Sequence, residues 1–130
     1  MPAPSHIPDP GPNSRAVITI GFLSIDPSAR CARLKGQTVS LTTLELDLLV
    51  YLARHADRPV SVWELLRQVW QCRSQLGGTA AQVKNCVKRL RQKIEPDPKR
   101  PCYLLTVRGY GYRMLTQREW EHRISNDSLI

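Results

Sequence analysis

The sequence predicts an α+β fold in which a small antiparallel sheet is followed by three helices and a β-hairpin. The first observation is periodicity, because apolar residues alternate with a period of two, then recur with the period of a helix, and finally alternate again. The second is a set of Ser/Thr-x-x-Glu sequences, each of which is typical of a helix start. The chain has 130 residues, of which 42% are hydrophobic and 23% charged, as in one ordinary globular domain.

The two ends of the chain are expected to lie outside this domain. Residues 1–15 hold five prolines together with Gly11, Asn13 and Ser14, a composition that cannot supply a core and that predicts a flexible tail or linker. Residues 16–115 should form the folded domain. Residues 116–130 should form a short terminal helix, starting at the capping box Thr116-x-x-Glu119, or a tail.

Four short runs near the start of the chain are typical of β-strands. They cover residues 17–20, 23–25, 31–34 and 37–40, and turn signals at Gly21, Asp26-Pro27 and Lys35-Gly36 separate them. This pattern favours a four-stranded antiparallel meander. Such a small sheet needs a helical layer to cover one of its faces.

Two helices are predicted next, each beginning with a capping box. The first starts at Thr42-x-x-Glu45 and ends near His55, which we expect to act as a cation at the helix C-terminus. The second starts at Ser61-x-x-Glu64 and runs through Trp70. Their apolar stripes are Leu44, Leu48, Leu49, Leu52 and Ala53 in the first, and Val62, Leu65, Leu66, Val69 and Trp70 in the second.

A third helix is predicted over residues 79–94, and it is amphipathic. Val83, Val87, Leu90 and Ile94 form one stripe, whereas the opposite face carries Lys84, Asn85, Lys88 and Gln92. The sequence Glu-Pro-Asp-Pro at residues 95–98 stops the helix. The formal net charge is +8, and residues 79–113 contribute +7 of it, with nine basic and two acidic side chains. Such a concentration of positive charge favours a polyanionic partner.

A β-hairpin is predicted directly after this helix. Its strands cover residues 102–107 and 110–115, with Arg108 and Gly109 at the tip. Three helices followed by a hairpin are the order of a winged helix-turn-helix. In that architecture the third helix enters the major groove of DNA, and the hairpin wing reaches the minor groove or the backbone.

Four motifs give the chain a specific resemblance over about residues 17–115. The motifs lie at residues 41–53 (L-T-x-x-E-x-x-L-L-x-x-L-A), 60–70 (V-S-x-x-E-L-L-x-x-V-W), 83–94 (V-x-x-x-V-x-R-L-R-x-K-I) and 106–113 (T-V-R-G-x-G-Y-R). They resemble the OmpR/PhoB-type winged-helix effector domain of bacterial response regulators. The resemblance implies an N-terminal four-stranded sheet, a three-helix bundle, and a hairpin that pairs with a strand between the first two helices. It also implies double-stranded DNA as the ligand, tandem homodimers on direct repeats, and a contact with RNA polymerase through the loop at residues 71–78.

Carried over position by position, the resemblance also names site residues. Lys88, Arg89 and Arg91 match positions that contact bases and phosphates, Asn85 matches a base-facing position, and Arg108 matches a wing arginine that enters the minor groove. Thr106 and Tyr112 match wing residues near the phosphates, and Trp70 matches an aromatic residue close to the backbone. Each position has a structural alternative, since Arg89 and Arg91 could solvate a helix face, Asn85 could face water, and Trp70 and Tyr112 could belong to the core.

The sequence departs from the family pattern at the start of the third helix. Ala81-Gln82 replaces the usual Arg-Thr, and Lys84 replaces an acidic residue, which should strengthen phosphate attraction and change the bases that are read. Cys86 stands where His or Tyr is frequent, and we expect a packed side chain there, with a redox role as the alternative. The chain carries no receiver domain, so phosphorylation is not expected to act within it.

Other functional classes are not expected. The sequence has no run of about 18 apolar residues and no apolar signal segment, so we expect a cytoplasmic protein without a membrane contact. The four cysteines lack metal-ligand spacing, and no catalytic motif is present, so we expect neither a metal, a cofactor nor an enzyme. The alternative function is a winged-helix module that binds an acidic protein, because fold does not fix function.

Overall fold

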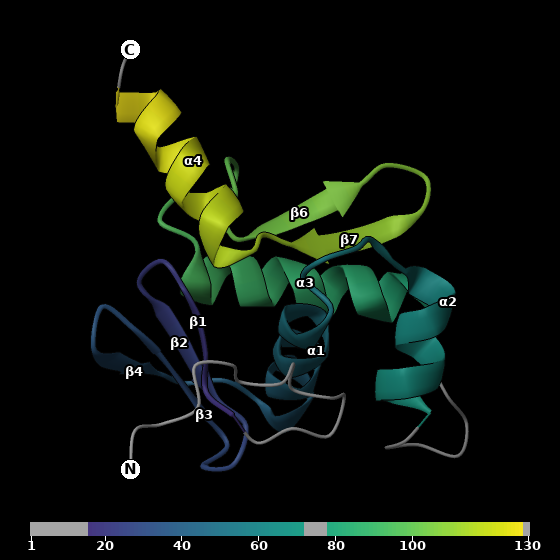
Figure 1. Ribbon diagram of the computed structural model, residues 1–130. Helices are drawn as coiled ribbons and strands as arrows, with labels where there is room; N and C mark the ends of the chain where they lie inside the picture. Colours follow the sequence, from purple (N-terminus) through teal and green to yellow (C-terminus); the bar gives the residue numbers. More distant parts are fainter. Residues whose placement is uncertain (1–15, 72–77, 129–130) are drawn as a thin grey trace, which may run out of the picture.

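The computed structural model describes residues 16–71 and 78–128, and it confirms the α+β class (Figure 1). The predicted meander is present as a sheet of four antiparallel strands in the order β1-β2-β3-β4. Its strands are β1 Ile18–Ile20, β2 Leu23–Asp26, β3 Cys31–Leu34 and β4 Gln37–Val39. The Pro-rich segment at residues 1–15 and most of the predicted loop at residues 71–78 lie outside the described residues.

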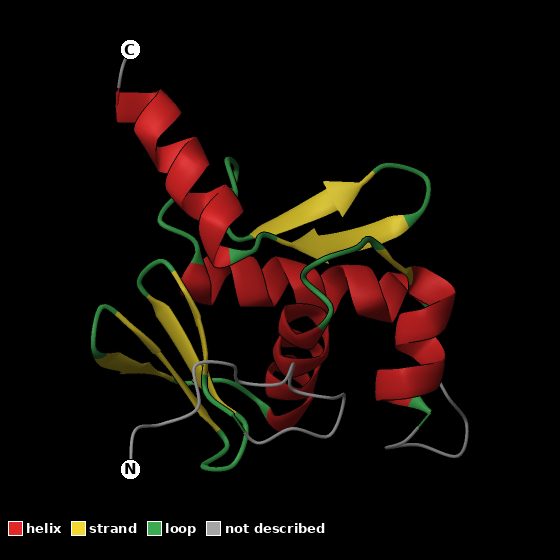
Figure 2. Ribbon diagram, viewed as in Figure 1, coloured by secondary structure: helices red, strands yellow, loops and turns green. Residues whose placement is uncertain are grey.

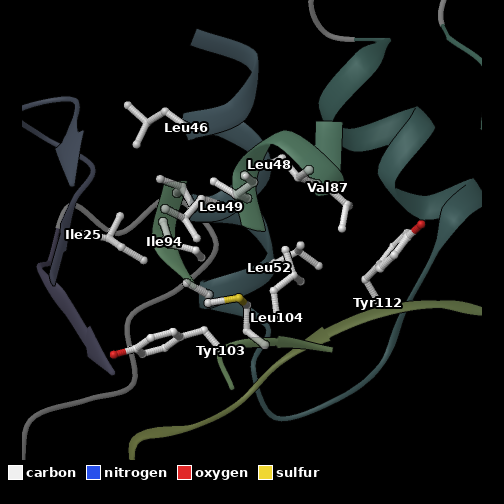
Figure 3. Packing of buried hydrophobic residues seen from close by; sticks show 14 of the residues in the cluster. Ile25, Leu46, Leu48, Leu49, Leu52, Val87, Ile94, Tyr103, Leu104 and Tyr112 are labelled. Carbon is white, nitrogen blue, oxygen red and sulfur yellow. The ribbon is translucent and has the colours of Figure 1, made fainter. Parts of the chain in front are cut away.

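Helix α1, Thr43–Arg54, covers one face of this sheet. Its predicted capping box is complete, since the Glu45 amide donates to Thr42 Oγ1 over 3.1 Å and the Thr42 amide donates to Glu45 Oε1 over 3.0 Å. Figure 3 shows Ile25 of β2 pointing from the sheet toward Leu49 of α1 and Ile94 of α3. These buried side chains join the sheet and the helices into one hydrophobic core.

The second helix differs from the prediction of one regular α-helix. It begins as α2, Val62–Leu65, and continues as the π-helical segment η1, Leu66–Trp70, in which the Gln71 amide donates to the Leu66 carbonyl over 2.8 Å. The wider turn inserts one residue into the helical repeat. Val69 and Trp70 are buried at the end of this segment.

The predicted capping box at Ser61 forms only by half. The Glu64 amide donates to Ser61 Oγ over 3.0 Å, but the Glu64 carboxylate does not return to the Ser61 amide. It accepts instead from two guanidinium nitrogens of Arg58, over 2.6 and 3.0 Å, and from the Tyr51 hydroxyl. A bidentate ion pair outcompetes a single bond to a backbone amide.

His55 lies at the C-terminal end of α1 as predicted, but its surroundings do not favour a positive charge. The imidazole is half-buried against the Tyr51 ring, with 4.5 Å between the ring centres. Burial and the neighbouring Arg58 lower the pKa of His55 below its ordinary value of 6.5. This lowering of the pKa disfavours the cationic form that the predicted role at the α1 C-terminus requires.

The third helix crosses α1, and the hairpin lies along the third helix (Figure 2). Helix α3 is Ala80–Ile94, and the hairpin strands are β6 Leu104–Val107 and β7 Gly111–Met114. Strand β7 pairs with β6 and also with the short strand β5, Val60–Ser61, as the resemblance implies. Gly111 is required for this pairing, because a Cβ there would lie 1.9 Å from the Val60 carbonyl oxygen.

A last helix, α4, covers Gln117–Ser128 and begins at the capping box formed by Thr116 and Glu119. Trp120 stacks on the Tyr103 ring at 6.2 Å between centres and lies against Gly21 in the β1–β2 turn. The Gly21 amide donates to Gln117 Oε1 over 2.6 Å. These contacts fix α4 to the N-terminal sheet. Over the described residues, no helix has the length and apolar character needed to cross a membrane.

Candidate nucleic-acid interface

Helix α3 begins with a capping box that the sequence analysis did not identify. The Gln82 amide donates to Thr79 Oγ1 over 3.2 Å, and the Thr79 amide donates to Gln82 Oε1 over 2.9 Å. The signal was present as Thr-x-x-Gln, the glutamine form of the motif. This cap fixes the start of the helix, and it thereby sets which side chains of α3 face outward.

The predicted polar face of α3 is exposed. Val83, Val87, Leu90 and Ile94 are fully buried, whereas Lys84, Asn85, Lys88 and Arg89 are exposed. Within residues 16–71 and 78–128, none of these four polar side chains has an ion pair or a hydrogen bond. Their polar ends are therefore available to an external ligand.

Arg91 has a different environment from its neighbours on α3. Its Nε donates to the Leu104 carbonyl over 3.0 Å and its Nη2 donates to Thr106 Oγ1 over 2.8 Å. The guanidinium also lies 5.9 Å from the centre of the Tyr112 ring. Burial lowers the pKa of Arg91 from its ordinary value of 12.5, and the group is half-buried. Arg91 thus joins α3 to both strands of the hairpin.

Glu95 provides a second connection between α3 and the hairpin, and sequence reasoning missed it. Its carboxylate is buried and accepts from the backbone amides of Cys102, Tyr103 and Leu104 over 2.7, 3.0 and 2.8 Å. In the sequence, Glu95 is only the residue before a helix-stopping proline. Its partners lie seven to nine residues further along the chain, beyond the range of any local pattern.

A groove of about 770 Å³ lies between α3, the hairpin and the turn at residues 97–99. It brings together six of the nine predicted site residues. They are Lys84, Asn85, Lys88, Arg91, Thr106 and Tyr112. Lys99 also lines the groove and Asp97 is its one carboxylate, so the lining is strongly basic. We call this surface the basic groove.

The other three predicted site residues lie elsewhere. Arg89 is exposed on the edge of α3 away from the hairpin, and Arg108 is exposed at the hairpin tip. Trp70 is only 5% exposed and lies in the core, where its indole faces Gly78. Tyr112 is 8% exposed and likewise belongs to the core (Figure 3), although it also lines the groove.

Two further residues of α3 serve the fold. Lys93 Nζ lies 2.5 Å from Glu45 Oε1, and that carboxylate is buried in α1. Cys86 is 3% exposed, and burial raises the pKa of its thiol to about 11. A buried neutral thiol is a poor nucleophile, which favours the packed interpretation of Cys86. No group of metal-ligating side chains occurs in the part of the chain that the structure describes.

An α3 helix with a basic exposed face, tied to a β-hairpin and covered behind by α1 and α2, defines a winged helix-turn-helix domain. A family model described as "Transcriptional regulatory protein, C terminal" matches residues 36–114. The chain belongs to this family. Family membership identifies a regulatory domain and not an enzyme.

Relatives and solved structures agree with this classification. The DNA-binding response regulator MtrA of Mycolicibacterium smegmatis is 42% identical over 97 residues, which are 75% of this chain and 42% of that protein. The response regulator DrrB of Thermotoga maritima, described as an OmpR/PhoB homologue, superimposes with a TM-score of 0.70 at 32% identity, over 76% of this chain and 44% of that one. The RstA DNA-binding domain of Klebsiella pneumoniae, solved in complex with the RstA box, gives a TM-score of 0.63 at 30% identity, over 76% and 96% of the two chains. The chain therefore spans less than half the length of MtrA.

Proposed function

We propose that this chain binds double-stranded DNA sequence-specifically and acts in transcription regulation. The observation that carries the proposal is the basic groove, in which side chains of α3 and of the hairpin line one continuous surface. A helix at this position fits the major groove, and the adjoining hairpin then lies over the minor groove or the backbone. The MtrA protein is named as DNA-binding, and the RstA domain was solved with its DNA site, which supports the same ligand here.

The proposed roles of the site residues follow from their exposure. Asn85 and Arg89 are exposed side chains with several donors, so we assign them to base edges. Lys84 and Lys88 are exposed point charges, which we assign to phosphates, and Arg108 at the tip is assigned to the minor groove.

Arg91, Thr106, Tyr112 and Trp70 have mainly indirect roles. Two donors of Arg91 are already bonded to the hairpin, so we assign to it mainly the role of positioning that hairpin. The exposed Thr106 hydroxyl remains able to contact a phosphate. Trp70 and Tyr112 support the DNA-binding surface from the core, and we assign their polar atoms to the sugar-phosphate backbone of the DNA.

The wider setting is also part of the proposal. We infer a cytoplasmic protein that binds direct repeats as a tandem homodimer and that reaches RNA polymerase through residues 71–78, of which 72–77 lie outside the described residues. The alternative, an acidic protein bound on α3, is less favoured because the exposed apolar side chains of that helix are only the small Ala80 and Ala81 at its start.

Selection of bound sequences from a random duplex pool tests the proposal directly. We expect one enriched motif, present as direct repeats, whose affinity falls by orders of magnitude between about 50 and 200 mM salt, as several phosphate contacts require. Recovery of unenriched sequences, or salt-independent binding, would contradict it. The isolated chain is suitable for this experiment, since the described residues share one continuous core.

A further inference from the structure

A second groove, of about 540 Å³, lies between the start of α2, the start of α3 and the hairpin tip. Two large aromatic side chains border it and are exposed to solvent, with Trp63 77% exposed and Tyr110 53% exposed. We call this surface the aromatic groove. Two exposed aromatic rings that border one groove form a contiguous apolar patch, and such patches are typical of binding surfaces.

The aromatic groove is held rigidly. The Val62 amide donates to the Tyr110 carbonyl over 3.2 Å, so the first residue of α2 is bonded to the hairpin tip. Strand β5 pairs with β7 directly behind this bond, and the close approach at Gly111 fixes their separation. Tyr110, which accepts this bond, and Trp63, which follows Val62, are thus held on two elements whose relative position is set by backbone contacts.

The aromatic groove is continuous with the basic groove. Thr106 and Tyr112 line both of them. At the tip, Arg108 lies two residues before Tyr110 in the chain and is exposed as well. The two grooves therefore form one surface, in which a basic part along α3 adjoins an aromatic part at the wing.

The chemistry of the two parts differs sharply. None of the described residues that line the aromatic groove carries a charge, whereas the basic groove contains five charged lysine, arginine and aspartate side chains. An uncharged aromatic surface cannot attract phosphates by charge, but it can pack against the apolar faces of deoxyribose rings. Tryptophan and tyrosine suit this role because each combines a large apolar ring with one hydrogen-bond donor.

We propose that the aromatic groove receives the DNA strand that borders the minor groove, with Trp63 and Tyr110 packed against its deoxyribose rings. The proposal rests on the proposed DNA binding and adds a contact to it that does not depend on salt. Because no counterion is released where an uncharged ring meets a sugar, this part of the affinity should persist as the salt concentration rises. A second copy of the chain or another protein on this groove is an alternative outcome of the test.

The first experiment measures anisotropy of a duplex that carries one half-site, so that only one copy of the protein is bound. Trp63→Ala should weaken binding about tenfold and Tyr110→Ala by a smaller factor, in line with the loss of a large buried aromatic contact. Neither change should alter the slope of log affinity against log salt. Arg108→Ala in contrast should reduce that slope by about 0.9. Phe22→Ala is the matched control, since Phe22 is 55% exposed on the β1–β2 turn and lines neither groove.

A second measurement reports contact itself. Trp63 is the exposed member of the three tryptophans, because Trp70 is buried and Trp120 is half-buried. Acrylamide should therefore quench the free protein mainly through Trp63, as comparison with Trp63→Phe will establish. Addition of the half-site duplex should reduce the quenching to the level of Trp63→Phe.

The outcomes separate the two proposals. If the parent protein binds the duplex but Trp63→Ala binds equally tightly, or if acrylamide still reaches Trp63 in the complex, the inference about the aromatic groove is wrong and DNA binding stands. Protection of Trp63 that appears only on a two-site duplex would assign the groove to a second copy, and it would likewise overturn the inference. If the parent selects no sequence at all, the proposed function fails first.

Discussion

The basic residues around α1 and those on the exposed face of α3 differ in their partners. Arg30, Arg58 and Lys93 pair with carboxylates of Asp47, Glu64 and Glu45 over 2.5 to 2.6 Å. Lys84, Lys88 and Arg89 have no acidic partner among the residues that the structure describes. The same residue types therefore serve the fold on one side and remain free for a ligand on the other, so net charge alone cannot locate an interface.

Among the charged residues that stabilise the fold, Glu95 should give the largest loss of stability when it is replaced. Glu95→Ala should lower the free energy of unfolding by about 3 kcal/mol, because it leaves three backbone amides in a buried site without their acceptor. Urea denaturation measures this loss. Glu95→Gln should be intermediate, since its amide oxygen can still accept.

The control for Glu95 is Glu121→Ala, which removes an exposed carboxylate from α4. That change should alter the stability by no more than about 0.5 kcal/mol. Equal stability of Glu95→Ala and Glu121→Ala would mean that the hairpin is held without the carboxylate.

Arg89 and Arg108 test the exposed basic residues that we assign to DNA. Each change to Ala should weaken specific DNA binding by about 2 kcal/mol, or roughly thirtyfold, while the stability of the free protein stays the same. Arg89→Ala should also relax the preference at one or two positions of the selected site. Anisotropy with the matched and mismatched duplexes measures both effects.

Arg30→Ala is the matched control for these two variants, because Arg30 already pairs with Asp47 on the sheet side of α1. Its DNA affinity should remain close to that of the parent. A loss as large as that of Arg89→Ala would show that total charge, and not the α3 face, governs binding.

Acid titration probes the paired group in another way. The Arg58 guanidinium holds the pKa of Glu64 at about 2, below its ordinary value of 4.5. A carboxyl with a lowered folded-state pKa stabilises the fold above the unfolded value and loses that contribution as the pH falls through the folded value. From pH 5 to pH 2, the parent should therefore lose about 1 to 2 kcal/mol more stability than Arg58→Met, after allowance for the partly exposed arginine.

Thermal denaturation of the parent and Arg58→Met across this pH range is the measurement. The comparison of the two proteins cancels the contributions of other carboxyls that titrate in the same pH range. The most notable is Glu119, whose pKa Arg113 also holds at about 2. Parallel stability curves for parent and variant would mean that Arg58 does not stabilise the ionised Glu64.

Most of the features that sequence reasoning found or missed divide by distance along the chain. The capping box at Thr79 is the exception, because its Thr-x-x-Gln signal is local and was still missed. The α3 stripe and the capping boxes at Thr42 and Thr116 are local patterns of three or four residues, so the sequence was sufficient to predict them. The bonds of Arg91 and Glu95 to the hairpin join residues seven to fifteen positions apart, and they depend on how the hairpin folds back.

Two further features were missed for a similar reason. Val69 and Trp70 are buried at the end of the π-helical turn η1, and its sequence contains no pattern that predicts this turn. Trp63 lies outside the predicted apolar stripe of the second helix, but the sequence alone did not show that it borders a groove together with Tyr110, which is 47 residues further along the chain. The exposed polar face of α3 could thus be predicted from sequence, whereas the bonds that join α3 to the hairpin and the exposed aromatic groove could not.

Lys84→Ala should give the smallest change in DNA affinity. It tests whether the position of a positive charge on α3 matters beyond the charge itself. Lys84→Ala and Arg33→Ala each remove one positive charge from an exposed side chain, the first on α3 and the second on β3. If Lys84 contacts a phosphate, its removal should weaken binding by about 0.5 to 1 kcal/mol on any duplex sequence and reduce the salt slope by about 0.9, whereas Arg33→Ala should change neither. Salt titrations of both variants on specific and random duplexes decide the matter. Equal effects of the two changes would show that Lys84 acts only through long-range charge. The lysine that replaces the acidic residue of the family pattern would then alter affinity without adding a contact.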